Sequence, residues 1–274
     1  SGNTREDGSR CGFGGCYYNR PADRTDDFNE LSARAGISTT LDSINYFAQI
    51  SLGFRPPQIN EAYRLQKKQN VTDLDSETLT MFEFGSKFEL ESLMGSLSFY
   101  QSKKKNSIFR DSQNFIVDNG KTDHKGVELS LSIFVNLRNT INANITYGDH
   151  RYDFETDTSM REKIRVDNKI DTAPKIMANL LWNININDDS NLSLEIEHMD
   201  SYYTDAANLH EYEGHTLYHA RFNREFSESL KGYLRIENLT DKRYAERADF
   251  NAFGGDRYFP GLPREVYIGL EYNF

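Results

Sequence analysis

Apolar and polar residues alternate one by one along many short segments of the chain. In the last segment, Val266 and Ile268 alternate with Glu265 and Tyr267. Because successive side chains of a strand point to opposite faces, this pattern predicts strands with one apolar and one polar face. Most of these segments have roughly the 9–11 residues that a tilted transmembrane strand needs. About eleven candidate strands lie near 29–41, 44–54, 78–90, 93–104, 122–136, 138–152, 172–186, 190–203, 215–226, 229–239 and 263–274.

The connections between these segments alternate between short turns and long polar loops. Short turns are expected at Asp42-Ser43, Glu91-Ser92, Asn136-Leu137, Asn187 to Ser190 and Ser227-Glu228. Long loops are expected near 55–77, 105–121, 153–171, 204–214 and 240–262. A soluble sandwich with Greek-key crossings gives no reason to segregate loop lengths in this way. Short turns at one end and long loops at the other are typical of outer-membrane barrels, so we predict an all-β, antiparallel, up-and-down transmembrane β-barrel.

The composition agrees with a membrane barrel rather than a soluble domain. Only 37% of the residues are hydrophobic, yet 13% are aromatic. A barrel needs only a lipid-facing apolar band, while its lumen and loops are polar. The formal charge of −10 argues against a nucleic-acid partner, which a basic surface would bind. The first residues carry no signal peptide, so we expect an exported protein with further sequence upstream.

Two cysteines, Cys11 and Cys16, bracket a glycine-rich segment near the beginning of the chain. A redox or zinc site is one interpretation, but the spacing is not that of a redox motif and no second cysteine pair completes a zinc site. The intervening glycines would allow so short a ring to close. A disulfide in an extracytoplasmic loop is therefore the favoured interpretation.

Four stretches resemble one family of barrels. Residues 53–63 read GFRPPQINEAY, residues 236–244 read IENLTDKRY, residues 258–264 read YFPGLPR, and the chain ends on an aromatic residue of an alternating strand. Together they resemble the motifs of TonB-dependent outer-membrane receptors, over roughly residues 29–274. The motif residues that carry the resemblance are Arg55, Pro56, Asn238, Asp241, Tyr244, Pro260, Gly261, Arg264 and Phe274.

The same residues have a local physical role. Pro56 cannot donate a ladder hydrogen bond, so the preceding strand has to end there. Asn238 and Asp241 form turns readily, and Pro260-Gly261 sets a second turn before the last strand. We therefore expect these motif residues to be architectural rather than ligand-binding.

The resemblance implies an uptake receptor for a scarce extracellular solute, such as an iron–siderophore, heme, cobalamin or metal complex. Its partners would be outer-membrane lipid and the TonB complex, and it would bind the TonB complex through an N-terminal region that this chain lacks. It would be located in the outer membrane of a Gram-negative bacterium. Family members have about 22 strands. We therefore expect residues 29–274 to form the C-terminal half of the barrel and residues 1–28 an extracellular loop segment. An open half-barrel and a forced small barrel are the two alternatives, and neither would support energy-dependent uptake alone.

Other kinds of function have weaker support. A passive porin would not explain the receptor-like motifs, and a barrel hydrolase would need a nucleophile, a base and an orienting group that converge. No motif for a catalytic site, a cofactor or a metal ion is present, so we expect no enzyme and no cofactor. One loop cluster has the polar groups to contact a ligand, although solvated loop polarity is the simpler interpretation. Its members are His210, Glu211, Glu213 and His215.

Overall fold

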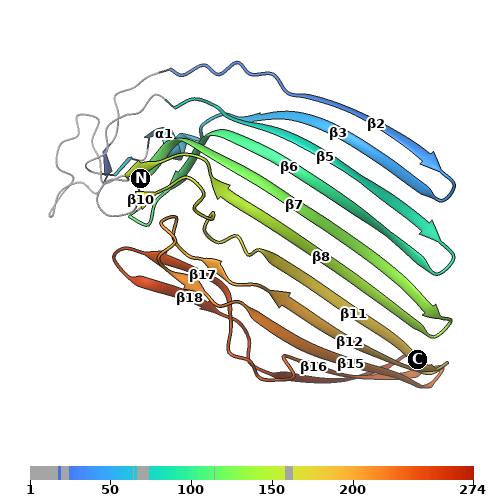
Figure 1. Ribbon diagram of the computed structural model, residues 1–274. Helices are drawn as coiled ribbons and strands as arrows, with labels where there is room; N and C mark the ends of the chain where they lie inside the picture. The colour runs from blue at the N-terminus through green and yellow to red at the C-terminus, as the bar shows by residue number, and fades with distance from the viewer. Residues whose placement is uncertain (1–17, 20–24, 64, 67–73, 114, 158–162) are drawn as a thin grey trace.

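One antiparallel sheet dominates the computed structural model (Figure 1), which describes residues 18–19, 25–63, 65–66, 74–113, 115–157 and 163–274. The sheet has 11 strands, and neighbours in its order are consecutive strands along the chain apart from short hairpins in the loops. This is the predicted up-and-down topology. The strands are β2 (Ala33–Leu41), β3 (Ile44–Arg55), β5 (Glu77–Leu90), β6 (Leu93–Arg110), β7 (Ile116–Asn136), β8 (Asn139–Tyr152), β11 (Ile176–Asn187), β12 (Ser190–Met199), β15 (His215–Ser227), β16 (Leu230–Glu237) and β19 (Glu265–Tyr272).

The remaining elements are short and lie in the connections between these strands. A five-residue helix, α1 (Ile59–Tyr63), follows β3. Within the described residues, no helix has the length and apolar character to cross a membrane. Four two-stranded sheets pair β1 (Tyr18–Asn19) with β4 (Leu65–Gln66), β9 (Thr156–Asp157) with β10 (Lys163–Ile164), β13 (Tyr202–Tyr203) with β14 (Glu211–Tyr212), and β17 (Ala245–Asn251) with β18 (Gly255–Pro260).

The connections segregate by length as predicted. Two-residue turns at 42–43, 91–92, 137–138, 188–189 and 228–229 all lie at one end of the sheet (Figure 1). The other connections lie at the opposite end, which we call the long-loop end. The turns predicted at Asn136-Leu137 and Ser227-Glu228 fall one residue later than expected. In both hairpins a register shift lies just before the turn, at Phe134/Asn136 and at Glu225/Ser227.

The long loop predicted at 105–121 is wrong. β6 continues to Arg110 and β7 already begins at Ile116, so only 111–115 connect them. The ladder persists through two register shifts, with Ser107 opposite Gly120 and Arg110 opposite Ile116. Such bulges break the strict two-residue period, which is why the polar segment gave no strand pattern.

The register of the strand pairs places apolar side chains on one face of the sheet and polar side chains on the other. One row across four strands consists of Leu192, Phe222, Leu234 and Ile268. The adjacent row on the other face contains Ser193, Arg221, Arg235 and Tyr267. Side chains of the apolar face are exposed, with Ile268 at 78% and the single tryptophan, Trp182, at 39%. An exposed apolar sheet face of this extent requires an apolar surrounding, as a lipid-facing barrel wall has.

Polar side chains bond to one another across strands on the polar face. Ser130 Oγ donates to Asn144 Oδ1 at 2.8 Å, and Ser193 Oγ donates to Asn183 Oδ1 at 2.7 Å. This face therefore suits a hydrated lumen.

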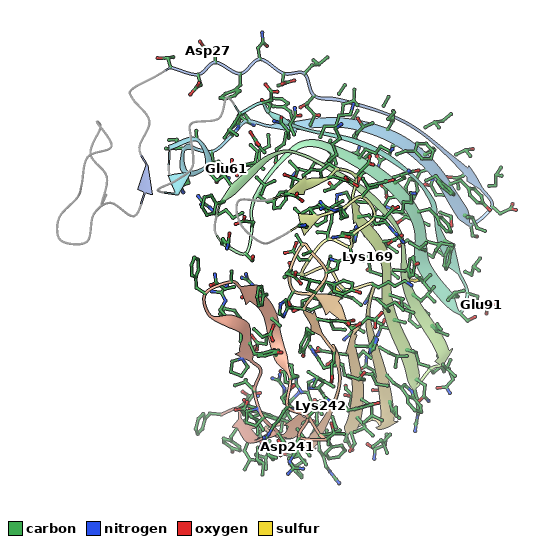
Figure 2. The ribbon with its side chains drawn as sticks, turned by 60° about the vertical axis from the view of Figure 1, so that its left-hand side comes forward. Asp27, Glu61, Glu91, Lys169, Asp241 and Lys242 are labelled. Carbon is green, nitrogen blue, oxygen red and sulfur yellow. The ribbon has the colours of Figure 1, made fainter. Side chains whose placement is uncertain are left out.

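The sheet is curved and open (Figure 2). β2 and β19 stand at its two ends, and no pairing between them occurs in the part of the chain that the structure describes. The open half-barrel is thus the observed architecture, and closure into a small barrel is wrong. Cys11 and Cys16 lie outside the described residues, and the assignment of 1–28 to an extracellular loop stays a prediction.

Candidate ligand-binding site at the long-loop end

Three connections converge at the long-loop end. They are the β6–β7 connection, the segment between β12 and β15, and the segment between β16 and β19, which contains the β17–β18 hairpin. Phe250 N donates to Thr204 O at 3.1 Å, and Ala252 N donates to Ser112 O at 3.1 Å. Backbone bonds between segments so distant in sequence hold the three connections as one unit.

Two buried tyrosines fasten the β17–β18 hairpin to the β13–β14 hairpin. The Tyr202 hydroxyl accepts from Ala248 N at 2.8 Å and donates to Ala248 O at 3.3 Å. The Tyr212 hydroxyl makes the same pair of bonds with Ala245, at 3.0 and 3.2 Å. Burial raises the pKa of Tyr202, so this hydroxyl remains protonated at neutral pH. Because each tyrosine satisfies both backbone groups of one alanine, the hairpin has a fixed position.

A charged cavity of about 190 Å³ lies where these connections meet. At its wall, the buried Asp249 carboxylate accepts from Arg247 Nη2 at 2.9 Å and from Arg257 Nε. The side chains of Arg247 and Arg257 are 65% and 50% exposed, so neither is enclosed by its contact with Asp249. The buried Thr204 residue also lines the cavity, and its hydroxyl has no hydrogen-bond partner in the part of the chain that the structure describes. The lining therefore contains both arginine donors and carboxylate acceptors and suits a polar ligand; besides Asp249 the acceptors are Asp111, Asp171 and Asp205.

The predicted loop cluster does not form one group. The His210 ring stacks on Phe250 with centroids 3.7 Å apart, and its Nδ1 lies 3.2 Å from Asp256 Oδ1. Glu211 lines a different cavity, of about 150 Å³, together with His150 and Lys169. Among the described residues, no three His, Cys, Asp or Glu side chains gather as a metal-ion site.

The other two members of the predicted cluster also point to different places. Glu213 is exposed, whereas His215 lies at the start of β15, where its Nδ1 is 2.9 Å from the Tyr212 hydroxyl. Burial, with smaller effects of His198 and Lys242, lowers the pKa of His215. Only His210 adjoins the arginine-lined cavity, through Phe250, and a ligand role for these residues stays a prediction.

The motif around Asn238 binds the motif that precedes the last strand. Asn238 is 2% exposed with a φ of 50°, and its Nδ2 donates to Lys242 O at 2.9 Å and Leu262 O at 3.2 Å. Its Oδ1 accepts from Lys242 N at 2.9 Å. Asp241, which is labelled beside Lys242 in Figure 2, accepts from Arg264 N through Oδ1 at 2.9 Å. These bonds bring together two turns that are separated by the whole β17–β18 hairpin.

Tyr244 completes this junction. Its carbonyl accepts from Gly261 N at 3.1 Å, and its ring occupies the position that a Cβ at residue 261 would need. Pro260 ends β18 directly before this glycine. Phe274, after β19, packs edge-on against Tyr272 with centroids 5.1 Å apart.

The first motif forms an ion-pair network at the end of β3. The Arg55 guanidinium binds Glu61 of α1 through two bonds of 3.0 Å and also binds Glu77. Glu77 is buried and accepts from Ile108 N at 2.8 Å, with Lys104 Nζ 2.9 Å away. Burial alone would raise the pKa of Glu77, but the bonds from Arg55, Ile108 and Lys104 hold it below its ordinary value. The exposed Pro56 follows directly and ends the strand.

Sequence reasoning indicated the loops of the site but missed its residues. Arg247, Asp249 and Arg257 lie within the predicted loop 240–262, and Thr204 begins the predicted loop 204–214. One sequence pattern indicated a charged hairpin here. Arg247 and Asp249 precede the Gly254-Gly255 pair, which is typical of a hairpin turn, and Arg257 follows it. Thr204 carries no local signal, because its position depends on contacts with distant segments.

Comparison with protein-family models and with solved structures shows which proteins the chain is similar to. The model of the TonB dependent receptor-like beta-barrel matches residues 4–239. A comparison with curated protein sequences gave no match. The chain is similar in structure to the siderophore receptor PiuA from Acinetobacter baumannii, with a TM-score of 0.72 and 19% identity over 87% of this chain and 35% of PiuA.

Two further structures show the same fold. The ferric yersiniabactin uptake receptor FyuA from Yersinia pestis has a TM-score of 0.70 and 17% identity, over 89% of this chain and 37% of FyuA. The copper transporter OprC has a TM-score of 0.70 and 16% identity, over 89% of this chain and 39% of OprC. The chain therefore spans little more than a third of the length of these proteins.

Proposed function

Because the chain belongs to the TonB-dependent receptor family, whose β-barrel model matches residues 4–239, we propose that it forms barrel wall and extracellular loops of an outer-membrane uptake receptor. The family match is the observation that carries the proposal. The apolar face would contact outer-membrane lipid, and the polar face would line the lumen. The TonB complex would be a partner of the complete receptor.

The ligand we propose is a scarce solute such as an iron–siderophore, heme, cobalamin or metal complex, bound without chemical change. The cavity beside Asp249 supports a polar chelate, because Arg247 and Arg257 present donors there on a positioned hairpin, next to aspartate carboxylates that can accept hydrogen bonds. The nine motif residues would act as supports for the loops. Asn238 illustrates this role, since its three side-chain bonds all reach backbone groups.

Uptake measured in cells tests the proposal. The complete reading frame that contains this chain would be expressed in a Gram-negative strain that lacks its own chelate receptors. Uptake of labelled ferric siderophores, heme, cobalamin and copper complexes would then be measured with and without TonB. We expect TonB-dependent uptake of one class. Uptake that continues without TonB would instead indicate a passive pore, and absence of uptake for every class would contradict the proposed ligands.

Substitutions in the cavity sharpen the test. Loss of a charge-assisted hydrogen bond costs about 1.5–3 kcal/mol, so Arg247→Ala or Arg257→Ala should weaken ligand binding by roughly 10- to 100-fold. Arg243→Ala is the matched control, because this exposed arginine is in the same connection but does not line the cavity. Equal affinity of all three variants would place the ligand elsewhere.

A further inference from the structure

Two imidazole rings face each other across neighbouring strands, away from the arginine-lined cavity. His124 of β7 and His150 of β8 are registered partners. Their Nδ1 atoms are 3.0 Å apart, and the ring centroids are 5.1 Å apart with 54° between the planes. One of the two Nδ1 atoms therefore donates a hydrogen bond to the other, and a metal ion bound to both nitrogens would displace that proton.

The pair lies on the polar face, toward the long-loop end of both strands. The neighbouring registered pairs, Lys125 with Asp149 and Asp123 with Arg151, project from the opposite face. Charged residues on the face that is otherwise apolar mark this level as outside the hydrocarbon layer. A cavity of about 150 Å³ reaches His150, so small solutes have access.

Both rings are held in place by their surroundings. Thr122 Oγ1 lies 2.8 Å from His124 Nε2, so an Nε2 proton donated to this hydroxyl leaves Nδ1 with a lone pair. The His150 ring lies against Gly148, where a Cβ would overlap its Nε2 atom. A hydrogen bond to the outer ring nitrogen is how proteins orient histidine ligands of metals.

The electrostatic surroundings allow a cation to bind. The two nearby ammonium groups each have a carboxylate partner, because Lys104 pairs with Glu77 and Lys169 pairs with Asp149.

We propose that His124 and His150 form a binding site for a divalent transition-metal ion, with Cu²⁺ preferred. With metal–nitrogen bonds of about 2.0–2.1 Å, a nitrogen separation of 3.0 Å corresponds to an angle of about 91–97° at the metal. That angle fits two adjacent positions of a square-planar Cu²⁺ or Ni²⁺ ion, and fits tetrahedral Zn²⁺ less well. No third protein ligand adjoins the pair within the described residues, so water or a ligand carried by the ion fills the other positions.

The site does not depend on the proposed uptake function. An uptake receptor for any solute, or a passive pore, could carry it, so metal binding and transport can succeed or fail separately.

Titration of the tag-free protein in detergent with Cu²⁺ tests the site. Electron paramagnetic resonance should show one copper per chain with coupling to two nitrogens. Loss of a residue that only orients a metal ligand lowers metal affinity by about 10- to 100-fold. Loss of a ligand itself should cost at least as much, so we expect His124→Ala and His150→Ala each to lower the Cu²⁺ affinity by at least about tenfold. Thr122→Val should weaken binding by about tenfold while the two-nitrogen spectrum is retained.

His198→Ala is the matched control, because His198 is half-buried and bonded to Thr216 on the other face of the sheet. It should leave the affinity unchanged. The spectrum of the wild-type protein tests the site even where a variant fails to fold. Coupling of copper to a single nitrogen in the wild-type protein would overturn the proposal. Copper binding that is lost in His198→Ala but kept in the other variants would also overturn it.

Discussion

The Tyr202 hydroxyl binds both backbone groups of Ala248, accepting from its N–H at 2.8 Å and donating to its C=O at 3.3 Å. The two residues are 46 positions apart, and Ala248 is 1% exposed. Among the described residues β18 is the one strand paired with β17, so the phenol takes the place of a strand partner on the other side. One side chain thus couples the loop after β12 to the hairpin that carries the candidate arginines.

Removal of this hydroxyl should loosen the hairpin. In Tyr202→Phe the buried N–H and C=O of Ala248 lose their partner, at a cost of about 1–3 kcal/mol for each unsatisfied group. We expect the Ala248 amide to exchange its hydrogen at least about tenfold faster. Tyr218→Phe, on an exposed position of β15, is the control and should change nothing in the hairpin. Unchanged exchange in Tyr202→Phe would mean that other contacts hold β17.

The junction at Asn238 should depend on both the side chain and the backbone conformation. Asn238→Ala removes three side-chain hydrogen bonds and also places alanine at a φ of 50°. Asn238→Gly removes the same hydrogen bonds, but glycine adopts this backbone conformation without strain. We expect alanine to lower the urea midpoint of unfolding more than glycine. Asn119→Ala, at an exposed residue with a φ of 55°, measures the backbone cost alone. A midpoint for Asn238→Ala no lower than that of Asn119→Ala would contradict a role for the side-chain bonds.

Acid should weaken the contacts of Glu77 before the rest of the sheet. The folded-state pKa of Glu77 lies below its ordinary value of 4.5, so its contribution to stability is present above that value and is lost as the pH falls through the folded pKa. Hydrogen exchange at the Ile108 amide, which donates to Glu77, should therefore accelerate below pH 4.5 beyond its intrinsic pH dependence. Glu77→Gln should remove this acceleration, and Glu89→Gln, exposed at the other end of β5, should retain it.

Strand positions followed from sequence because alternation is a local property. All eleven predicted strands occur, since a lipid-facing and a lumen-facing wall impose the two-residue period on every crossing. The extension of β6 and β7 toward the long-loop end did not follow. There Asn106 and Asn119 have φ values of 55°, and register shifts interrupt the period.

The candidate site was predictable only to the level of loops. Charged residues in 240–262 were visible, but the partners that position them, such as Tyr202 for Ala248, come from another loop. The pairing of His124 with His150 could not be predicted from the sequence, because it depends on the register of β7 and β8. A one-residue slip would place them on opposite faces.

The single tryptophan allows a direct test of which face meets lipid. Trp182 lies on the apolar face of β11, 39% exposed, between Leu194 and Ile141 of the neighbouring strands. In vesicles with brominated acyl chains, the fluorescence of Trp182 should be strongly quenched, because bromine quenches on contact and the ring lies in the lipid-facing row. The matched variant combines Trp182→Phe with Leu181→Trp, which moves the indole by one residue to the polar face. Its fluorescence should be insensitive to bromine but quenched by a small water-soluble quencher such as acrylamide. The reverse pattern, with lipid quenching at position 181 and none at 182, would mean that the polar face meets the membrane and would contradict the barrel assignment.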